Sequence, residues 1–205
     1  MNAVPPADGA PGSARAGDAD SAVRLFVALW PDDGVRAALI DSAARWAWRQ
    51  GTARESAQRL HLTLHFLGSV ARDRIGPLRG ELALAWRPFD LSLAQATLWS
   101  GGIAVLEPAD VVQPLADLHA ALGAALRRLG LRTEARAFRP HVTLARRAAG
   151  ASPPGQVAPV HWRVDAYALV ASPGAGAYEV VQVYRAGAAP SLEQRQRATG
   201  AHPLQ

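Results

Sequence analysis

Short stretches of alternating apolar and polar residues recur along the chain, and such alternation predicts half-buried β-strands. Strands are predicted at residues 24–29, 61–66, 91–98, 102–106, 141–146, 162–171 and 178–184. The last two flank Ser172-Pro173-Gly174, a combination typical of a hairpin turn. Residues 149–159 hold three prolines and two glycines and predict a loop.

Apolar residues at helical spacing predict three helices between these strands. The first follows Pro31, starts at an Asp32 or Asp33 cap, and has its apolar face at Val35, Leu39, Ile40, Ala43 and Trp46. The second covers residues 77–86. The third begins at Pro114, ends at Gly130, and carries a stripe of leucines at 115, 118, 122, 126 and 129. Elements in this order predict an α+β fold with two similar halves.

One four-residue pattern occurs twice in the predicted strands, 80 residues apart: His61-Leu62-Thr63-Leu64 and His141-Val142-Thr143-Leu144. Side chains alternate between the two faces of a strand, so each histidine shares one face with its threonine while the apolar residues face the core. If the two strands are neighbours, two titratable groups and two hydroxyls surround one small volume. Such a site suits moving one proton on and another off at a phosphate.

Two further side chains follow from the same alternation. His65 is predicted on the face of His61 and Thr63, as a secondary contact with substrate further along the groove. Strict alternation would place Arg146 on the core side, which a guanidinium resists, so the strand is predicted to end or twist there. Trp99 is interpreted mainly as a buried ring, and Arg139 and Arg147 as residues of a solvated face.

The spacing His61-x-x-x-His65 also raises the question of a metal. On a helix, two histidines four residues apart form a zinc pair. On a strand the same spacing covers roughly 13 Å, too far for two ligands about 2 Å from one ion. No metal site is predicted.

The pattern resembles the 2H phosphoesterase superfamily, and more closely its bacterial and archaeal RNA 2′,3′-cyclic phosphodiesterases, also called 2′-5′ RNA ligases. The resemblance covers roughly residues 23–187 and rests on RLFVAL at 24–29, LHLTLHFLG at 60–68, FRPHVTLAR at 138–146, and LVAS at 169–172 followed by Tyr178. The chain departs from the family at Ala171, where a glutamate is frequent.

The resemblance implies a two-lobed, pseudo-symmetric fold with antiparallel sheets facing a central cleft and helices outside. It implies hydrolysis of RNA 2′,3′-cyclic phosphate ends to 2′-phosphates, with His61 as proton donor and His141 as proton acceptor. Thr63, Thr143 and Arg146 then bind the phosphate. The expected partner is an RNA with a cyclic phosphate end, tRNA fragments included. Reversible 2′-5′ ligation is also implied; no cofactor is expected, and the protein is expected to be a monomer.

Composition limits the remaining choices. Residues 1–22 and 188–205 are poor in apolar side chains and predict disordered tails around a 23–187 domain. The net charge is +5, rising to about +6 for the domain without its tails, which favours an anionic partner. No cysteine, signal peptide or membrane span is found, so a cytoplasmic protein is expected. Two alternatives stay open: an RNA- or nucleotide-binding module without turnover, and a 2H phosphodiesterase that acts on a small cyclic nucleotide.

Overall fold

The structure, a computed structural model, describes residues 22–174 and 177–187. The predicted tails lie outside these residues, except that Ala22 already belongs to the first strand. The strands are β1 (Ala22–Leu29), β2 (Ala53–Arg54), β3 (Leu62–Ala71), β4 (Phe89–Trp99), β5 (Ile103–Pro108), β6 (Val142–Arg146), β7 (Val160–Val164), β8 (Ala166–Gly174) and β9 (Ala177–Arg185). The helices are α1 (Asp33–Ala44), α2 (Ile75–Glu81) and α3 (Gln113–Arg128), with short 3-10 turns η1 (Ala57–Arg59) and η2 (Arg72–Arg74).

The strands form one antiparallel sheet with the order β7-β4-β5-β6-β3-β1-β8-β9, and β2 attaches to β6. The sheet consists of two halves with four strands each, β7-β4-β5-β6 and β3-β1-β8-β9. The two halves meet at the pair Leu62↔Val142, where β3 and β6 begin side by side before they diverge. The predicted α+β class with two lobes of antiparallel strands is confirmed, and one register pair joins the lobes.

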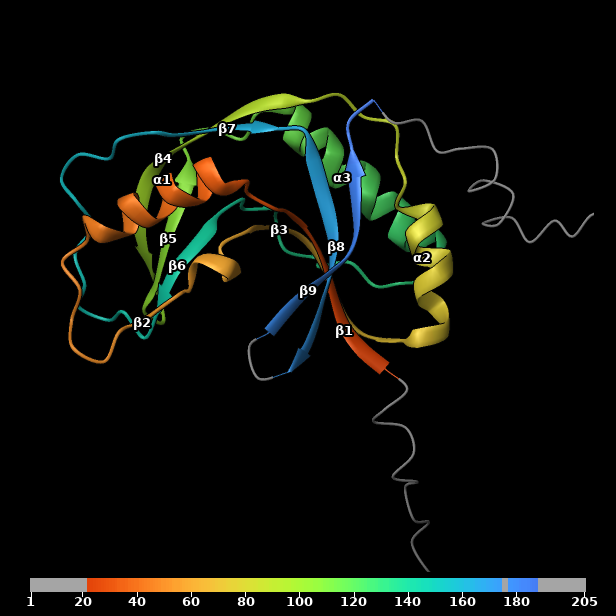
Figure 1. The fold of residues 1–205 in the computed structure, drawn as a ribbon, viewed down its shortest axis with the longest axis horizontal. Helices are drawn as coiled ribbons and strands as arrows, with labels where there is room; N and C mark the ends of the chain where they lie inside the picture. The colour runs from red at the N-terminus through yellow and green to blue at the C-terminus, as the bar shows by residue number, and fades with distance from the viewer. Residues whose placement is uncertain (1–21, 175–176, 188–205) are drawn as a thin grey trace, which may run out of the picture.

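Each long connecting helix covers the opposite half of the sheet. Helix α1 lies between β1 and β3 in the chain but packs beside β7, and α3 lies between β5 and β6 but contacts β3 and α2. Figure 1 shows α1 over the half that contains β4, β5 and β6, and α2 and α3 on the side of β8 and β9. Helices α1 and α3 therefore connect the two halves in addition to the single β3–β6 pair.

The helices follow the predicted apolar faces with local differences. Asp32 caps α1 by accepting a hydrogen bond from the Val35 N–H at 2.8 Å, whereas Ile40 is exposed and Trp46 lies beyond the helix. The predicted leucine stripe of α3 is buried from Leu115 to Leu126. Helix α2 covers Ile75–Glu81 and not the predicted 77–86. It starts before Pro77 because proline is tolerated in the first turn of a helix, and Pro77 is its third residue.

The prediction of one strand at 162–171 is wrong. The chain breaks at Asp165: β7 pairs with β4 in one half of the sheet, and β8 pairs with β1 in the other. Figure 1 shows the bend between them. The residues that face the main core change from even positions, ending at Val164, to odd positions, starting at Tyr167. Ala166, Ala168 and Val170 are apolar as well, so the alternation in the sequence hides this change. The final hairpin is confirmed, but β8 extends through Gly174, so the predicted turn 172–174 belongs to the strand.

Candidate active site

The two motif histidines lie on one face of the joint between the halves. Leu62 and Val142 are paired and fully buried, so the residues that flank them point to the opposite face. An antiparallel register sets His61 across from Thr143, and Thr63 across from His141. The structure therefore brings together both histidines and both threonines, which sequence reasoning proposed as one site.

A β-bulge follows the threonine in each motif strand. On β3, Ala28 pairs with Thr63 but Val27 pairs with His65, which leaves Leu64 as an extra residue. On β6, Val105 pairs with Thr143 and Ala104 with Ala145, so Leu144 is extra at the equivalent position. A bulge switches the faces of all later residues in its strand. The two motif strands thus share a distortion as well as a sequence pattern.

The bulges decide where the next side chains point. The prediction that His65 shares the face of His61 and Thr63 is wrong: His65 is 5% exposed and its Nε2 contacts the carbonyl oxygen of His119 in α3 at 2.8 Å. The bulge turned it to the core side. The bulge on β6 turns Arg146 from the core side to the exposed face, and its side chain is 56% exposed. The predicted irregularity near the end of this strand therefore exists. Phe66, at the equivalent position on β3, is 53% exposed.

His61 is held by one backbone contact and three aromatic rings. Its Nδ1 lies 2.6 Å from the carbonyl oxygen of Arg59. Ring centroids of Phe26, Trp30 and Tyr178 lie 4.9, 5.7 and 5.4 Å from the imidazole. Phe26 belongs to a small apolar cluster separate from the main core. One side of the site is therefore apolar and aromatic.

His141 is held in the same way in the other half. Its Nδ1 lies 2.8 Å from the carbonyl oxygen of Arg139, again two residues earlier, and its ring lies 4.3 Å from that of Trp99. The Arg139 guanidinium lies 4.2 Å above the Trp99 ring and makes two hydrogen bonds to the buried Glu107, at 2.7 and 3.1 Å. Arg139 is thus tied to the site, although the sequence suggested only a solvated face for it.

These contacts set the protonation chemistry of both imidazoles. A carbonyl oxygen only accepts hydrogen bonds, so each Nδ1 carries a hydrogen and each Nε2 is the atom available to substrate. Burial lowers the pKa of His61 and of His141 below the usual 6.5. The carbonyl contact and a nearby carboxylate, Glu55 for His61 and Glu107 for His141, oppose this decrease. Burial therefore favours the neutral form of each imidazole, whereas the carbonyl contact and the carboxylate favour the protonated form. Burial has the larger effect on the pKa of both histidines.

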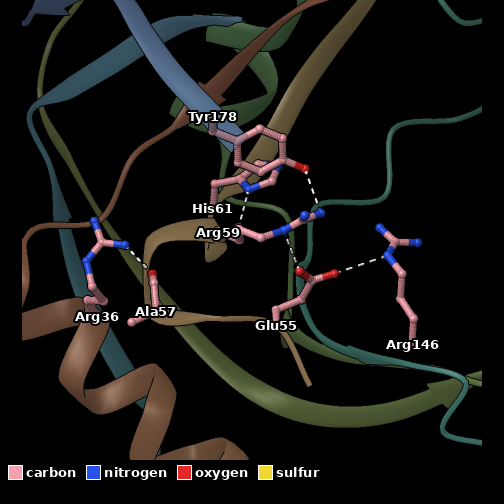
Figure 2. A network of polar contacts seen from close by, with 7 residues as sticks. All are labelled: Arg36, Glu55, Ala57, Arg59, His61, Arg146 and Tyr178. Atoms are coloured by element: carbon pink, nitrogen blue, oxygen red, sulfur yellow. Dashed lines mark hydrogen bonds and ion pairs between the residues drawn. The ribbon is translucent and has the colours of Figure 1, made fainter. Parts of the chain in front are cut away.

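Glu55 connects the two halves of the site. It forms ion pairs with Arg59 at 2.8 Å and with Arg146 at 3.1 Å. Figure 2 shows the chain of contacts from Arg146 through Glu55 and Arg59 to His61 and Tyr178. Arg36 of α1 donates hydrogen bonds to the Ala57 and Pro31 carbonyl oxygens, which fixes the turn that carries this network. Sequence reasoning missed Glu55 and Arg59. Their own pair is only four residues apart, but what ties it to the site is Arg146, which is distant in sequence, and His61, which is reached through a backbone atom.

No group of three His, Cys, Asp or Glu side chains within residues 22–174 and 177–187 is arranged to hold a metal ion. In the same part of the chain, no helix is long and apolar enough to cross a bilayer. What the site offers is two imidazole Nε2 atoms, two hydroxyls and a guanidinium around one volume. These groups can transfer protons and bind the oxygens of a tetrahedral anion.

Comparison with known proteins agrees with this geometry. The family model of the 2′-5′ RNA ligase superfamily matches residues 31–175, and the chain belongs to this superfamily. Its structure is similar to apo LigT from Escherichia coli, with 26% identity, a TM-score of 0.70, and coverage of 81% of this chain and 98% of LigT. A phosphoesterase structure matches with 25% identity, a TM-score of 0.71, and coverage of 80% and 98%.

A protein from Thermus thermophilus matches with 27% identity, a TM-score of 0.63, and coverage of 79% and 97%. No curated protein sequence matches the chain. The resemblance to 2H phosphoesterases inferred from the two motifs is confirmed.

Proposed function

We propose that this protein hydrolyses the 2′,3′-cyclic phosphate at an RNA end to a 2′-phosphate, with two histidines and no metal. The observation that carries the proposal is the pair of imidazoles, each fixed through Nδ1 by a carbonyl oxygen, on one face with Thr63 and Thr143. Breaking a P–O bond at neutral pH requires a proton acceptor for water and a proton donor for the leaving alkoxide. Two imidazoles supply both.

In the proposed reaction, Nε2 of His141 takes a proton from water as the water oxygen bonds to phosphorus. The bond between phosphorus and O3′ breaks in line, and Nε2 of His61 gives its proton to O3′. Exchange with solvent then restores both histidines. The donor and acceptor roles follow the family resemblance. Thr63, Thr143 and Arg146 hold the nonbridging oxygens, whose negative charge increases in the transition state.

Phe66 gives the site a place for a base. It stands on β3 where Arg146 stands on β6, and its ring is 6.2 Å from that of Phe26. An exposed aromatic ring on the strand that carries His61 and Thr63 is suited to stacking on an unpaired nucleobase. LigT, 25% identical to this chain, has been crystallised with 3′-AMP, which supports nucleotide binding in this fold. By microscopic reversibility, the same groups could join a cyclic end to a 5′-hydroxyl through a 2′-5′ bond.

The test is incubation of the protein with a short RNA that ends in a 2′,3′-cyclic phosphate, with excess EDTA present. We expect a 2′-phosphate product at an undiminished rate, and a 2′-5′ linked product when a 5′-hydroxyl RNA is added. Binding without turnover would indicate a nucleotide-binding module. Turnover of 2′,3′-cyclic AMP but not of the oligonucleotide would indicate a small-nucleotide enzyme. Loss of activity on chelation, restored by a divalent ion, would contradict the metal-free mechanism.

The domain charge of about +6 favours the oligonucleotide over a mononucleotide. We propose that the protein acts on such RNA ends, tRNA fragments among them, as a monomer in the cytoplasm. Raising the salt concentration should therefore weaken the oligonucleotide reaction more than the reaction of 2′,3′-cyclic AMP.

A further inference from the structure

Glu55 directly follows β2, a two-residue strand outside the main order of the sheet. Strands β3 and β6 share only the pair Leu62↔Val142 and run in opposite directions from it. The edge of β6 at Ala145 and Arg146 is therefore open to β2, which pairs with it. The Glu55 N–H then donates to the Leu144 carbonyl oxygen at 2.8 Å. Leu144 is the extra residue of the β6 bulge, so the distortion that exposes Arg146 also anchors Glu55.

The two oxygens of Glu55 serve two different arginines. Oε1 accepts a hydrogen bond from Arg146 Nε at 3.1 Å, and Oε2 lies 2.8 Å from Arg59 Nε. The carboxylate side chain is only 11% exposed. A largely buried carboxylate between two guanidiniums is fixed more firmly than one in an exposed pair, because water screens it less.

One of these contacts orients Arg146. Its Nε is taken by Glu55, and Figure 2 shows the two terminal nitrogens turned away from the carboxylate. A guanidinium held in this way presents the edge that binds two oxygens of a phosphate at once. Without Glu55, the long Arg146 side chain would have to be ordered anew in each binding event.

The other contact reaches His61. Arg59 lies 4.8 Å above the Tyr178 ring and donates to the Tyr178 hydroxyl at 3.3 Å. Tyr178 stands edge-on against His61, and the Arg59 carbonyl oxygen holds His61 Nδ1. Glu55 therefore supports both the backbone contact and one ring contact of this imidazole.

The equivalent carboxylate in the other half has a narrower role. Glu107 pairs with Arg139, which holds His141 through its carbonyl oxygen, just as Arg59 holds His61. Among the ion pairs of the described residues, Arg139 is its one cationic partner, and its Oε2 also accepts from Trp99 Nε1 at 3.1 Å. A carboxylate that links a histidine support to a phosphate-binding arginine occurs, among the described residues, on the His61 side alone.

We propose that Glu55 is a positioning residue that couples Arg146 to His61, so that the phosphate-binding group and the proton donor are held in one arrangement. The proposal rests on the function proposed above. Glu55 itself does not touch the reacting atoms; it acts through Arg146 and Arg59.

The test uses Glu55→Gln in the full chain, with Asp90→Asn as the matched control. Asp90 forms an exposed pair with Arg163 across β4 and β7, remote from the site. We expect Glu55→Gln to reduce kcat/KM on the cyclic-phosphate RNA by about tenfold to a hundredfold, the range for misplaced catalytic groups. Asp90→Asn should stay near the wild-type value. Equal kcat/KM for Glu55→Gln and wild type, with the fold intact by circular dichroism, would overturn the proposal.

Arg146→Ala separates positioning from a general structural effect. In that background, Glu55→Gln should no longer weaken inhibition by inorganic phosphate, since its effect there acts through Arg146. The variant should still move the His61 titration to lower pH, because the carboxylate charge beside the imidazole is lost. Full additivity of the two substitutions in phosphate inhibition would contradict the coupling.

Histidine titration by NMR keeps this proposal apart from the proposed function. A wild-type protein that does not hydrolyse the RNA would overturn the function. The His61 midpoint would still report on Glu55. We expect that midpoint to fall in Glu55→Gln while the His141 midpoint changes less. An unchanged His61 midpoint would overturn the role of Glu55 even in an active enzyme.

Discussion

The half of the site around His61 and the half around His141 share one backbone plan but differ in lining. In each, a carbonyl oxygen two residues earlier holds Nδ1, and a bulge follows the threonine. In each, an arginine lies over an aromatic ring and pairs with a glutamate. What differs is the residue exposed after the bulge, which is Phe66 on β3 and Arg146 on β6.

The difference suggests that the two halves have different roles in binding although their backbones are alike. The shared features orient an imidazole, which both sides need. The aromatic side can stack on a base, and the arginine side can bind the phosphate charge. A substrate with a base on one side of a single phosphate fits this asymmetry, and the predictions below test it.

The largest expected effect comes from the residues that the halves share. His61→Ala and His141→Ala should each reduce kcat about a hundredfold to ten-thousandfold, the usual range for a general acid or base. The double variant should lose less than the product of the two, because both act on one transition state. Single-turnover kinetics with the cyclic-phosphate RNA measures this. Near wild-type turnover in either folded single variant would disprove the two-histidine mechanism.

The comparison between the halves is sharpened by Arg146→Ala and Phe66→Ala. Arg146→Ala should reduce kcat/KM by roughly a hundredfold or more on every cyclic phosphate, since a charged contact to the transition state is lost. Phe66→Ala should cost roughly five- to a hundredfold, the worth of one stacked base, mainly in KM. Rates with a purine end, a pyrimidine end and an abasic end provide the readout. If Phe66→Ala affects the abasic substrate equally, base stacking is the wrong account.

Smaller effects are expected from the hydroxyls. Thr63→Ala and Thr143→Ala should each reduce kcat/KM less than the histidine variants do, because water or Arg146 can partly replace a neutral donor. Thr→Ser, which keeps the hydroxyl, should retain more activity than Thr→Ala in the same assay. Equal loss in Ser and Ala variants would show that the threonines act through packing.

The smallest expected effect concerns stability at low pH and the imidazole that the bulge turned inward. His65 stacks on His119 at 4.1 Å, and His119 on Phe138 at 3.9 Å. Burial and the neighbouring His65 lower the pKa of His119 to about 4. A histidine with a lowered pKa stabilises the fold fully above its unfolded value near 6.5, and this contribution is lost as pH falls toward 4. In urea unfolding, the free energy of unfolding of His119→Phe should therefore fall less between these pH values than that of wild type. An equal fall would show that the stacked pair of His119 and His65 is not the source of the pH dependence.

Local patterns in the sequence predicted most of the elements and both motif strands. The leucine stripe of α3 and the alternation at His61-x-Thr63 are local properties, and both appear as expected. The bulges are not local, since an extra residue exists only relative to a paired strand. For that reason His65 was placed on the wrong face. The contacts of Glu55 join residues up to 91 positions apart, which no periodicity shows.

The break at Asp165 was missed for a related reason. Ala166, Ala168 and Val170 continue the apolar alternation across it, while the strand's partner changes from β4 to β1 and the core face moves to Tyr167 and Leu169. Phe66 and Arg146 were visible in the sequence, but only the structure shows that they are equivalent positions. The sequence pattern thus predicts the strands that carry the histidines and threonines. The pairing between strands decides which other side chains are exposed at the site.

The central claim, that His61 and His141 act as donor and acceptor on one phosphate, is tested most directly by the pH dependence of kcat/KM on the cyclic-phosphate RNA. One imidazole must be protonated and the other neutral, so the account predicts a bell-shaped profile. Burial lowers both pKa values, so the profile should be centred on the acidic side of 6.5. His61→Ala and His141→Ala should each reduce the bell to a single limb. A rate independent of pH between about 5 and 8, where histidine titrates, would contradict the account.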